Sequence, residues 1–562
     1  MNRRDFLATV PLTLTAEALG VPHVRASEPA FRPSESAAHA APAPALSPSH
    51  DLGFASALRA AEAIRSKEVS SVELTRLIFE RIDRYNPQLN AFTYQLREEA
   101  LSQARNADEA QSRGESLGIL HGVPLHVKEC FGVAGHPCTW GLLAFRDSKA
   151  AKTSMVADRL LRAGAVLIGA TNVPVALHDW QSYNPIYGTT NNPWDLKRTP
   201  GGSSGGSAAA LAAGLGYLSV GTDLAGSVRV PASFCGIYGH KPTLDLVSSK
   251  GSLPGGSSRP PGFSTLLAVS GPMGRSAADL LAVLKVLGGP VDWDAKAWKW
   301  ELPPSRRRSL KEFRVGYVLN DPIVPPTLEV EAVLQKAIQS LERAGATLKP
   351  GWPPGVQSAE LLDNYRFLLD AYTFSVAPPG EQMAARAAFA NSQKPQSTGG
   401  TNNWFVGTSA ALCSFAEWQR QNLRRLEFRS QWQAYFDQVD VFLSPVAFTA
   451  AFAHDHSEPQ VQRTILTSSS VKPYFDLPNW VATATLTGCP ATVAPVGQTK
   501  AGLPVGIQIM GPYWEDATPI TFAGLLAEEL GGFNFESVAD STLLNCLDLP
   551  LCSTPSLPAL SE

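Results

Sequence analysis

The chain has 562 residues, 44% apolar and 17% charged, which suits one large globular α/β domain or two closely joined ones and excludes a disordered protein. Lys plus Arg number 47 and Asp plus Glu number 50, so the net charge of −3 lacks the basic excess that a nucleic-acid partner usually requires. No apolar run approaches the roughly 18 residues that a membrane span needs.

The N-terminal fifty residues are expected to lie outside the globular fold. Residues 1–26 place the pair Arg3-Arg4 before a mostly apolar stretch, and residues that a signal peptidase reads follow at 24–26. This pattern predicts a twin-arginine export signal and hence a periplasmic protein. Residues 27–50 are rich in Ala, Pro and Ser, which predicts a flexible linker. We expect one catalytic domain over residues 51–540 and a tail over 541–562.

The seven cysteines are odd in number and widely spaced, which does not predict a dense disulfide framework. None belongs to a C-x-x-C pair, so we expect no zinc site, and no organic cofactor is expected either. Cys546 and Cys552 can pair in an oxidising periplasm, and two ordinary thiols are an equal alternative.

Apolar periodicity gives the expected elements in chain order. They are a helix over Ala57–Asn86, a strand entering a loop over Gly118–Val127, a helix over Ala151–Ala163, strands at Val166–Gly169, Tyr217–Gly221 and Phe313–Val318, a helix over Thr327–Ala344, a surface loop over Gln393–Asn403, a helix over Val481–Thr487, and strands at Ala491–Pro495, where the proline ends the strand, and Val505–Met510. The last two strands suggest a hairpin around Thr499–Gly502. Helices alternating with short apolar strands indicate an α/β layered fold.

The segment with the most chemical information begins at Thr199 and reads TPGGSSGGSAAALAAG, a tight loop that opens a helix. A phosphate-binding loop is disfavoured because the Gly-Lys-Ser/Thr ending is missing. A plain Gly/Ser linker is disfavoured by the flanking strand and helix patterns. Gly201–Gly205 also matches the nucleophile elbow G-x-S-x-G of a Ser-His-Asp esterase. The acid and base of that alternative would come from Asp223, His240, His454 and His456.

A longer pattern fits more of the chain. The run from Gly201 to Thr243 reads GGSSGGSAAALAAGLGYLSVGTDLAGSVRVPASFCGIYGHKPT and closely resembles the signature of the amidase signature family. Further matching segments are GVPLHVKE at 122–129, GATNVP at 169–174, YGTTNNPWD at 187–195, and TGCPATVAPVG with GLPVGIQIMGP within 487–512. The resemblance covers about residues 52–535. It implies the family's fold, a central mixed β-sheet covered on both sides by helices.

The resemblance also implies the site residues. The family's catalytic lysine, cis-peptide serine and nucleophilic serine fall on Lys128, Ser203 and Ser227, and the two serines stand 24 positions apart, 227 minus 203, as the family pattern requires. The remaining roles are oxyanion-hole N–H groups from Leu224, Ala225, Gly226 and Ser227, and supporting positions at Ser204, Asp223 and Arg229. Asp223 and Arg229 are expected to brace the nucleophile loop as a charge-assisted pair.

This chain departs from the family pattern at a few positions. Ala225-Gly226 replaces the usual Gly-Gly, and Ala is compatible with that loop where φ is negative. Glu129 replaces the usual Asp after the lysine, and Cys130 after it is expected to serve packing. His240 stands where an apolar residue is common, and we expect it to be structural.

The expected activity is hydrolysis of a small carboxylic amide through an acyl-enzyme, with ester or carbamate cleavage as a side activity. An apolar or aryl acyl group is expected from the aromatic residues of the middle segment, although these rings can equally form core: Trp352, Tyr365, Phe367, Tyr372, Phe374, Trp404 and Phe405. A non-catalytic periplasmic binding protein is the remaining alternative, but a binding protein needs none of Lys128, Ser203 and Ser227.

Overall fold

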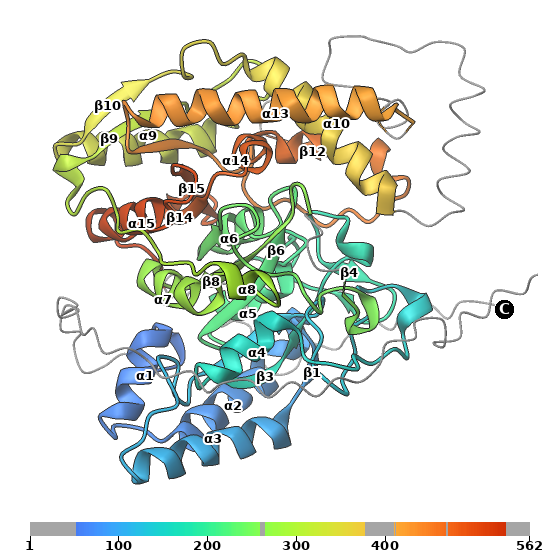
Figure 1. Ribbon diagram of the computed structural model, residues 1–562, viewed down its shortest axis with the longest axis vertical. Helices are drawn as coiled ribbons and strands as arrows, with labels where there is room; N and C mark the ends of the chain where they lie inside the picture. The colour runs from blue at the N-terminus through green and yellow to red at the C-terminus, as the bar shows by residue number, and fades with distance from the viewer. Residues whose placement is uncertain (1–51, 259–264, 377–409, 411, 468–469, 535–562) are drawn as a thin grey trace, which may run out of the picture. The chain divides into compact units, whose positions relative to one another are not determined.

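An 11-stranded mixed sheet forms the centre of the computed structural model, which describes residues 52–258, 265–376, 410, 412–467 and 470–534 (Figure 1). From one edge to the other its strands are β1 (Phe92–Gln95), β3 (Val166–Thr171), β2 (Pro124–Lys128), β6 (Leu218–Asp223), β8 (Val269–Gly274), β7 (Tyr238–Lys241), β14 (Ala491–Gln498), β15 (Pro504–Met510), β11 (Val441–Pro445), β9 (Arg314–Tyr317) and β10 (Thr347–Pro350). β2 and β3 pair in parallel and β14 and β15 antiparallel. The expected α/β fold with a mixed central sheet is confirmed.

Helices lie on both faces of this sheet. They are α1 (Ala57–Arg65), α2 (Ser71–Leu89), α3 (Arg97–Ser112), α4 (Met155–Arg162), α5 (Gly205–Ala212), α6 (Arg229–Cys235), α7 (Ala277–Leu287), α8 (Asp294–Ala297), α9 (Leu328–Arg343), α10 (Ser358–Val376), α13 (Phe415–Phe436), α14 (Ala482–Thr487) and α15 (Ala517–Leu530). Leu284 of α7 and Ile520 of α15 share one buried cluster with Leu443 of β11, whereas Trp432 of α13 shares another with Phe442. Successive strand residues point to opposite faces, so these clusters cover the two sides.

The N-terminal helical segment differs from the prediction. The single helix expected over Ala57–Asn86 is wrong, because the structure divides it into α1 and α2. Lys67 between them has a φ of 60°, and Ser70 and Glu73 form a reciprocal capping box that starts α2. The S-x-x-E spacing of that box was visible in the sequence and is a sufficient signal for the break. The strand expected over Gly118–Val127 is also shorter, since β2 begins only at Pro124.

At the C-terminal end, β14 and β15 form the expected hairpin, and the Thr499 N–H donates to the Leu503 carbonyl across the turn at 2.9 Å. The expectation that Pro495 ends its strand is wrong, because β14 continues to Gln498. β7 pairs only with Ala491–Val493 of β14, so the missing N–H of Pro495 removes no bond on that side. The register shifts just after the proline, between Pro495 and Gly497.

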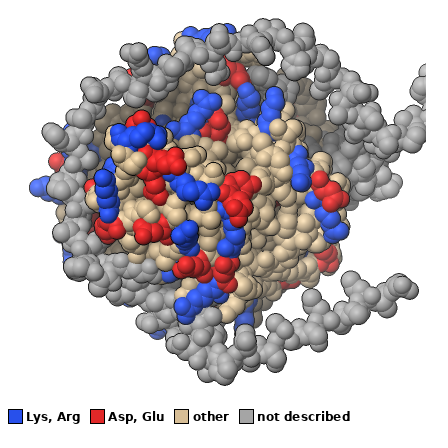
Figure 2. Space-filling model, turned by 90° about the horizontal axis from the view of Figure 1, so that it is seen from below, with Lys and Arg blue, Asp and Glu red and all other residues tan. Residues whose placement is uncertain are grey.

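Figure 1 places α1, α2 and α3 at the lower end and α10 beside α13 at the upper end. On the face seen from below, basic and acidic side chains are interspersed (Figure 2). Within the described ranges, no helix combines the length and apolar character needed to span a bilayer. The predicted export signal, linker, 393–403 loop and Cys546–Cys552 pair lie outside the described residues, as do residue 51 and residues from 535 on.

Candidate active site

The candidate site lies where two neighbouring parallel strands end. β2 and β6 pair with Val127 opposite Val220, so Lys128 at the end of β2 and Asp223 at the end of β6 reach the same edge of the sheet. The carboxyl ends of parallel strands are the usual position of ligand sites in α/β sheets. The nucleophile loop, residues 224–228, follows β6 directly and leads into α6.

Lys128 is a buried amine held by two hydroxyl groups. Its Nζ donates to Ser203 Oγ at 2.7 Å and to Thr222 Oγ1 at 2.8 Å, and the residue has no exposed surface. Burial lowers the pKa of Lys128 from its ordinary value of 10.5 to about 8, although nearby acidic groups act in the opposite direction. An amine with such a pKa exists partly in the neutral form near pH 8, and in that form it can accept the proton of Ser203.

Ser203 lies in the glycine-rich loop before α5, and its peptide bond with Gly202 is cis, as the family resemblance implies. The preceding residue has to be glycine. A Cβ at Gly202 would lie 2.6 Å from the Asp179 carbonyl oxygen and 2.8 Å from the Gln181 nitrogen. The backbone of residues 179–181 therefore packs directly against this peptide and keeps Ser203 facing Lys128.

Ser227 lies in the nucleophile loop and is the most accessible of the three. It is 7% exposed, whereas Ser203 is 1% exposed and Lys128 is fully buried. The Ser204 N–H donates to the Ser227 carbonyl at 3.1 Å, and this bond joins the two loops beside Ser203. Among the described residues no hydrogen-bond partner contacts Ser227 Oγ, so this hydroxyl is free to face a substrate. Ser204 also contacts the Thr222 carbonyl through its Oγ at 3.4 Å.

Asp223 and Arg229 form the expected charge-assisted pair beneath the nucleophile loop. The Arg229 guanidinium binds both carboxylate oxygens, at 2.9 Å and 2.8 Å, and neither side chain is exposed. Asp223 also accepts the N–H groups of Gly226 and Val228 at 3.0 and 3.2 Å. Burial by itself would raise the pKa of Asp223, but the charge and hydrogen bonds of Arg229 hold it below its ordinary value. The carboxylate thus fixes the loop from within.

The N–H groups predicted for the oxyanion hole differ in their availability. The Gly226 N–H donates to Asp223, whereas those of Leu224, Ala225 and Ser227 have no partner in the described part of the chain. Gly226 has a φ of 93°, and a Cβ there would lie 2.9 Å from side-chain carbons of Val230 and Val481. Ala225 has no positive φ, so its extra methyl group is accommodated.

Sequence reasoning missed two residues that touch this site. Thr222 is the second acceptor of Lys128, and its position next to Asp223 in the motif was an available signal. Trp180 donates from Nε1 to the Ala225 carbonyl at 2.8 Å and so ties the nucleophile loop to the segment beside Ser203. No periodicity or motif in the sequence pointed to Trp180.

A buried hydrogen-bond network holds residues 179–181, the segment beside Ser203, in place. Asp179 accepts from Arg463 Nη1 at 2.7 Å and from the Tyr474 hydroxyl. Gln181 Nε2 donates to the Asp455 carbonyl at 2.6 Å. These partners are more than 270 positions away in the sequence, which is why the network could not be predicted.

The histidines proposed for an esterase elbow lie in other environments. His240 contacts Thr492 Oγ1 at 2.9 Å and Asp516 Oδ1 at 3.1 Å, and burial lowers its pKa. His454 contacts Asn191, and the His456 ring stacks on Tyr183. None of the three hydrogen-bonds to Ser203 or Ser227, and Asp223 is occupied by Arg229. The structure therefore assembles no Ser-His-Asp arrangement from these residues.

Within the described residues, no group of three or more His, Cys, Asp or Glu side chains is arranged to hold a metal ion. The five described cysteines are free thiols. Burial raises the pKa of the Cys130 thiol to about 12, so this residue next to Glu129 is kept as an uncharged packing group. Glu129 itself accepts the Thr139 and Trp140 N–H groups.

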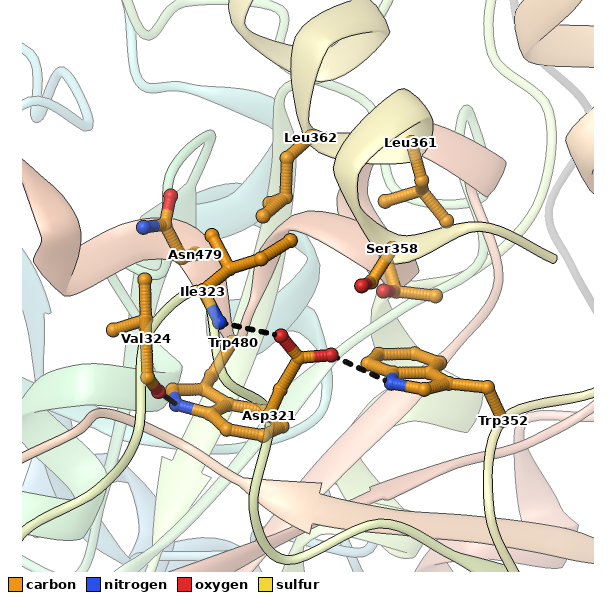
Figure 3. A pocket seen from close by; sticks show the side chains of 10 residues that line it. Asp321, Ile323, Val324, Trp352, Ser358, Leu361, Leu362, Asn479 and Trp480 are labelled. Atoms are coloured by element: carbon orange, nitrogen blue, oxygen red, sulfur yellow. Dashed lines mark hydrogen bonds between the residues drawn. The ribbon is translucent and has the colours of Figure 1, made fainter. Parts of the chain in front are cut away.

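A small pocket of about 20 Å³ lies between α10, α14 and the segment around residue 321 (Figure 3). Its walls come from the segment around residue 321, from Trp352 after β10, from α10, and from residues 479–483 at the start of α14. They include Asp321, Ile323, Leu361, Leu362 and Trp480. Ile323, Leu361 and Leu362 share an apolar cluster with Leu224 and Ala225. Of the aromatic residues expected to line such a pocket, Trp352 does so, Tyr365 and Phe367 are buried in the same cluster, Tyr372 and Phe374 are half-buried on α10, and Trp404 and Phe405 lie outside the described residues.

Known proteins resemble this chain over most of its length. The profile of the family described as Amidase matches residues 73–519. The chain is 31% identical to a glutamyl-tRNA(Gln) amidotransferase subunit of Nostoc sp. over 474 residues, 80% of this chain and 92% of the relative. It is 30% identical to fatty-acid amide hydrolase 2-A of Danio rerio over 514 residues, 85% of this chain and 89% of the relative. The crystal structure of a bacterial aryl acylamidase matches with a TM-score of 0.71 at 22% identity, covering 89% of this chain and 99% of that one, which supports the fold.

Proposed function

The chain belongs to the amidase family, and on that premise we propose that it hydrolyses a carboxylic amide with Ser227 as the nucleophile. The observation that carries the proposal is the buried contact of 2.7 Å between Lys128 Nζ and Ser203 Oγ. A lysine whose pKa burial lowers to about 8 is suited to act as a general base. Ser204, the residue after Ser203, donates its N–H to the Ser227 carbonyl and so holds the two loops together.

The reaction begins with two proton transfers. Neutral Lys128 accepts the proton of Ser203, Ser203 accepts the proton of Ser227, and the Ser227 oxygen attacks the amide carbonyl carbon. The tetrahedral oxyanion is stabilised by N–H groups of residues 224–227, each of which is worth about 10²–10³ in rate. The free N–H groups of Leu224, Ala225 and Ser227 support this role directly. For Gly226, the N–H must turn from Asp223 or be shared with it.

The leaving amine then takes a proton. Ser203 donates to the departing nitrogen and regains its proton from Lys128, so the C–N bond breaks and an ester remains on Ser227. Water attacks this acyl-enzyme, the same relay removes its proton, and the carboxylic acid is released. Ser204, Asp223 and Arg229 act by holding the two loops in place.

The substrate is proposed to be a small amide with an apolar or aryl group, since Leu224 and Ala225 of the nucleophile loop pack against an apolar cluster that includes Leu361 and Leu362. The protein is also proposed to be exported, because Arg3-Arg4 and the following apolar stretch resemble a twin-arginine signal. Cell fractionation with the native N-terminus, beside a variant carrying Lys at both positions 3 and 4, tests the export.

The activity is tested with a panel of anilides, primary amides, short peptides and p-nitrophenyl esters. The wild type is expected to cleave amides, Lys128→Ala to lose amide cleavage while keeping part of its ester cleavage, and the surface variant Lys336→Ala to behave as the wild type. A fluorophosphonate should label Ser227 in the wild type and leave Ser227→Ala unlabelled. A folded wild type that cleaves no amide and takes up no label would contradict the proposal and favour a binding protein.

A second candidate follows from the relatives that are glutamyl-tRNA(Gln) amidotransferase subunits. In that case the chain would act as one component of a tRNA-dependent transferase. An export signal is incompatible with that role, which is why hydrolysis by the isolated chain is preferred. Amide cleavage that appears only with partner proteins and tRNA present would support the transferase role instead.

A further inference from the structure

Residues 179–182, here called the bridging segment, hold the loop that carries Ser203. The Ser182 hydroxyl donates to the Gly201 carbonyl at 3.1 Å and accepts the Gly205 N–H at 3.0 Å. Since these two partners lie on either side of Ser203 in the chain, the bridging segment fixes both ends of this short loop. Its backbone also packs against the peptide that precedes Ser203.

The bridging segment holds the nucleophile loop as well. Trp180 donates from Nε1 to the Ala225 carbonyl at 2.8 Å, two positions before Ser227. One short segment therefore contacts the loops of both serines, and a change in its position moves the loops relative to each other. Proton transfer between Ser203 and Ser227 depends on their relative position, because a misplacement of about 1 Å can lower a rate roughly 10²-fold.

A buried ion pair fixes the bridging segment. The side chains of Arg463 and Asp179 are 0% and 2% exposed, and Arg463 Nη1 donates to Asp179 Oδ2 at 2.7 Å. The Tyr474 hydroxyl and the Gln181 N–H donate to the other oxygen, Asp179 Oδ1, the latter at 3.1 Å. Both carboxylate oxygens are therefore bound, so the side chain of Asp179 is held in one orientation.

The guanidinium of Arg463 is itself held by several acceptors. Its Nε donates to the Ser457 carbonyl at 2.6 Å, and its Nη2 donates to the Tyr183 hydroxyl at 2.8 Å and to the Glu458 carboxylate at 2.9 Å. A planar guanidinium can serve these acceptors and Asp179 at the same time, whereas the compact ammonium of a lysine cannot. The geometry of Arg463, and not its charge alone, therefore fixes the bridging segment.

We propose that Arg463 and Asp179 are positioning residues of the hydrolase, which set the distance between Ser203 and Ser227 through the bridging segment. This inference rests on the proposed function. In the described structure neither side chain hydrogen-bonds to the catalytic lysine or to either serine, so the pair acts through the two loops. The expected consequence of disturbing it is a loss of kcat with little change in KM, because the reacting groups are displaced and ground-state binding is not.

The test replaces Arg463 with lysine, which keeps a positive charge beside Asp179, and uses the anilide that the wild type cleaves fastest. The kcat of Arg463→Lys is expected to fall about 30-fold, with KM changed less than about threefold. The matched control is Arg275→Lys. Arg275 is 4% exposed and donates to the Leu211 and Gly216 carbonyls at 2.9 and 2.7 Å, but it follows β8 at the edge of the sheet opposite the site. Arg275→Lys should keep the kcat of the wild type, and equal kcat values in the two variants overturn the proposal.

A double-mutant cycle with Trp180→Phe shows whether Arg463 acts through the bridging segment. Alone, Trp180→Phe is expected to lower kcat about fivefold. In the Arg463→Lys background its further effect should be less than about twofold, because the bond to the nucleophile loop is already displaced. Effects that multiply as for independent sites overturn the proposal. If Arg463→Lys does not fold, Tyr474→Phe takes its place in the cycle, since it removes one donor of Asp179 and keeps the ion pair.

Labelling of Ser227 by a fluorophosphonate separates this inference from the proposed function, because the labelling rate reports the activation of the serine without an amide. Arg463→Lys is expected to be labelled about tenfold more slowly than the wild type, and Arg275→Lys at the rate of the wild type. Amide cleavage with unchanged kcat and labelling in Arg463→Lys overturns the positioning role and keeps the hydrolase. Labelling that slows only in Arg463→Lys, with no amide cleaved by the wild type, supports the positioning role and overturns amide hydrolysis.

Discussion

Replacing Lys128 with methionine should abolish amide hydrolysis and at the same time make the stability difference from the wild type depend on pH. Methionine has a similar length and no charge. The pKa of Lys128 falls from 10.5 to about 8 on folding because the amine is buried. The unfolded chain therefore holds more protons than the folded chain between pH 8 and 10.5, and the free energy of unfolding of the wild type rises with pH in that window.

The magnitude follows from about 1.36 kcal/mol for each pKa unit. At pH 7 the burial of the charged amine lowers the free energy of unfolding of the wild type by about 3.4 kcal/mol. At pH 10 the amine is mostly neutral in the folded chain, and the reduction is only about 0.8 kcal/mol. Between pH 7 and pH 10, the free energy of unfolding of the wild type should therefore rise by about 2.5 kcal/mol relative to that of Lys128→Met. The variant also loses two hydrogen bonds, worth about 1 kcal/mol each, and this loss changes its free energy of unfolding by the same amount at both pH values.

The assay is urea denaturation of both proteins at pH 7 and pH 10. Lys336→Met provides the control, since residue 336 is exposed on α9 and its replacement should change the free energy of unfolding by less than about 0.5 kcal/mol at either pH. A difference between wild type and Lys128→Met that is the same at both pH values would refute the reasoning, because it would mean that folding leaves the affinity of this amine for protons unchanged.

Further outcomes follow from the same contacts. The kcat/KM of the wild type on an anilide should rise with pH and level off above about 8, because the neutral form of Lys128 is the base; a profile that falls over pH 7–9 would contradict this. Ser203→Ala should lower kcat/KM by about 10²–10⁴ while its denaturation curve stays close to that of the wild type. Arg229→Met should cost about 3–5 kcal/mol of unfolding free energy in urea, since it leaves a buried carboxylate unpaired. Trp180→Phe should lower kcat about fivefold with KM little changed, because one positioning hydrogen bond of about 1 kcal/mol is lost.

Most of the site residues that the resemblance predicted are local in the chain, and Lys128, which lies 75 positions before Ser203, is the exception. Ser203, Ser204, Asp223, Ser227 and Arg229 lie within one contiguous motif, and the structure brings the two loops that carry them together. The fold class could be predicted because the buried strands are short apolar runs between helical segments. The break between α1 and α2 was not predicted, because the helical periodicity of apolar residues continues across it. The Ser70 and Glu73 spacing of the capping box was nevertheless recognisable in the sequence.

The part that could not be predicted is assembled from distant segments. The pocket combines Asp321, Trp352, Leu361 and Trp480, residues from three separate parts of the chain with no common spacing. The middle segment of the chain shows no clear periodicity because contacts with residues distant in the sequence determine which of its side chains are buried. Trp352, for example, stacks against Phe442 in the sheet. Such contacts have no periodicity along the chain, so sequence reasoning could suggest aromatic lining but could not select its members.

The buried charges of this protein divide into two kinds with different consequences. Asp223 and Arg229 are mutually compensated and hydrogen-bonded to the loop around them, so they hold its shape and have no capacity to exchange protons with a substrate. Lys128, in contrast, has only hydroxyl groups as hydrogen-bond partners, so its charge is incompletely compensated in the described structure. An incompletely compensated buried charge costs stability, and for Lys128 that cost falls when the proton leaves. The lack of a charged partner that makes Lys128 costly for stability is therefore also what lets this amine give up its proton and act as a base.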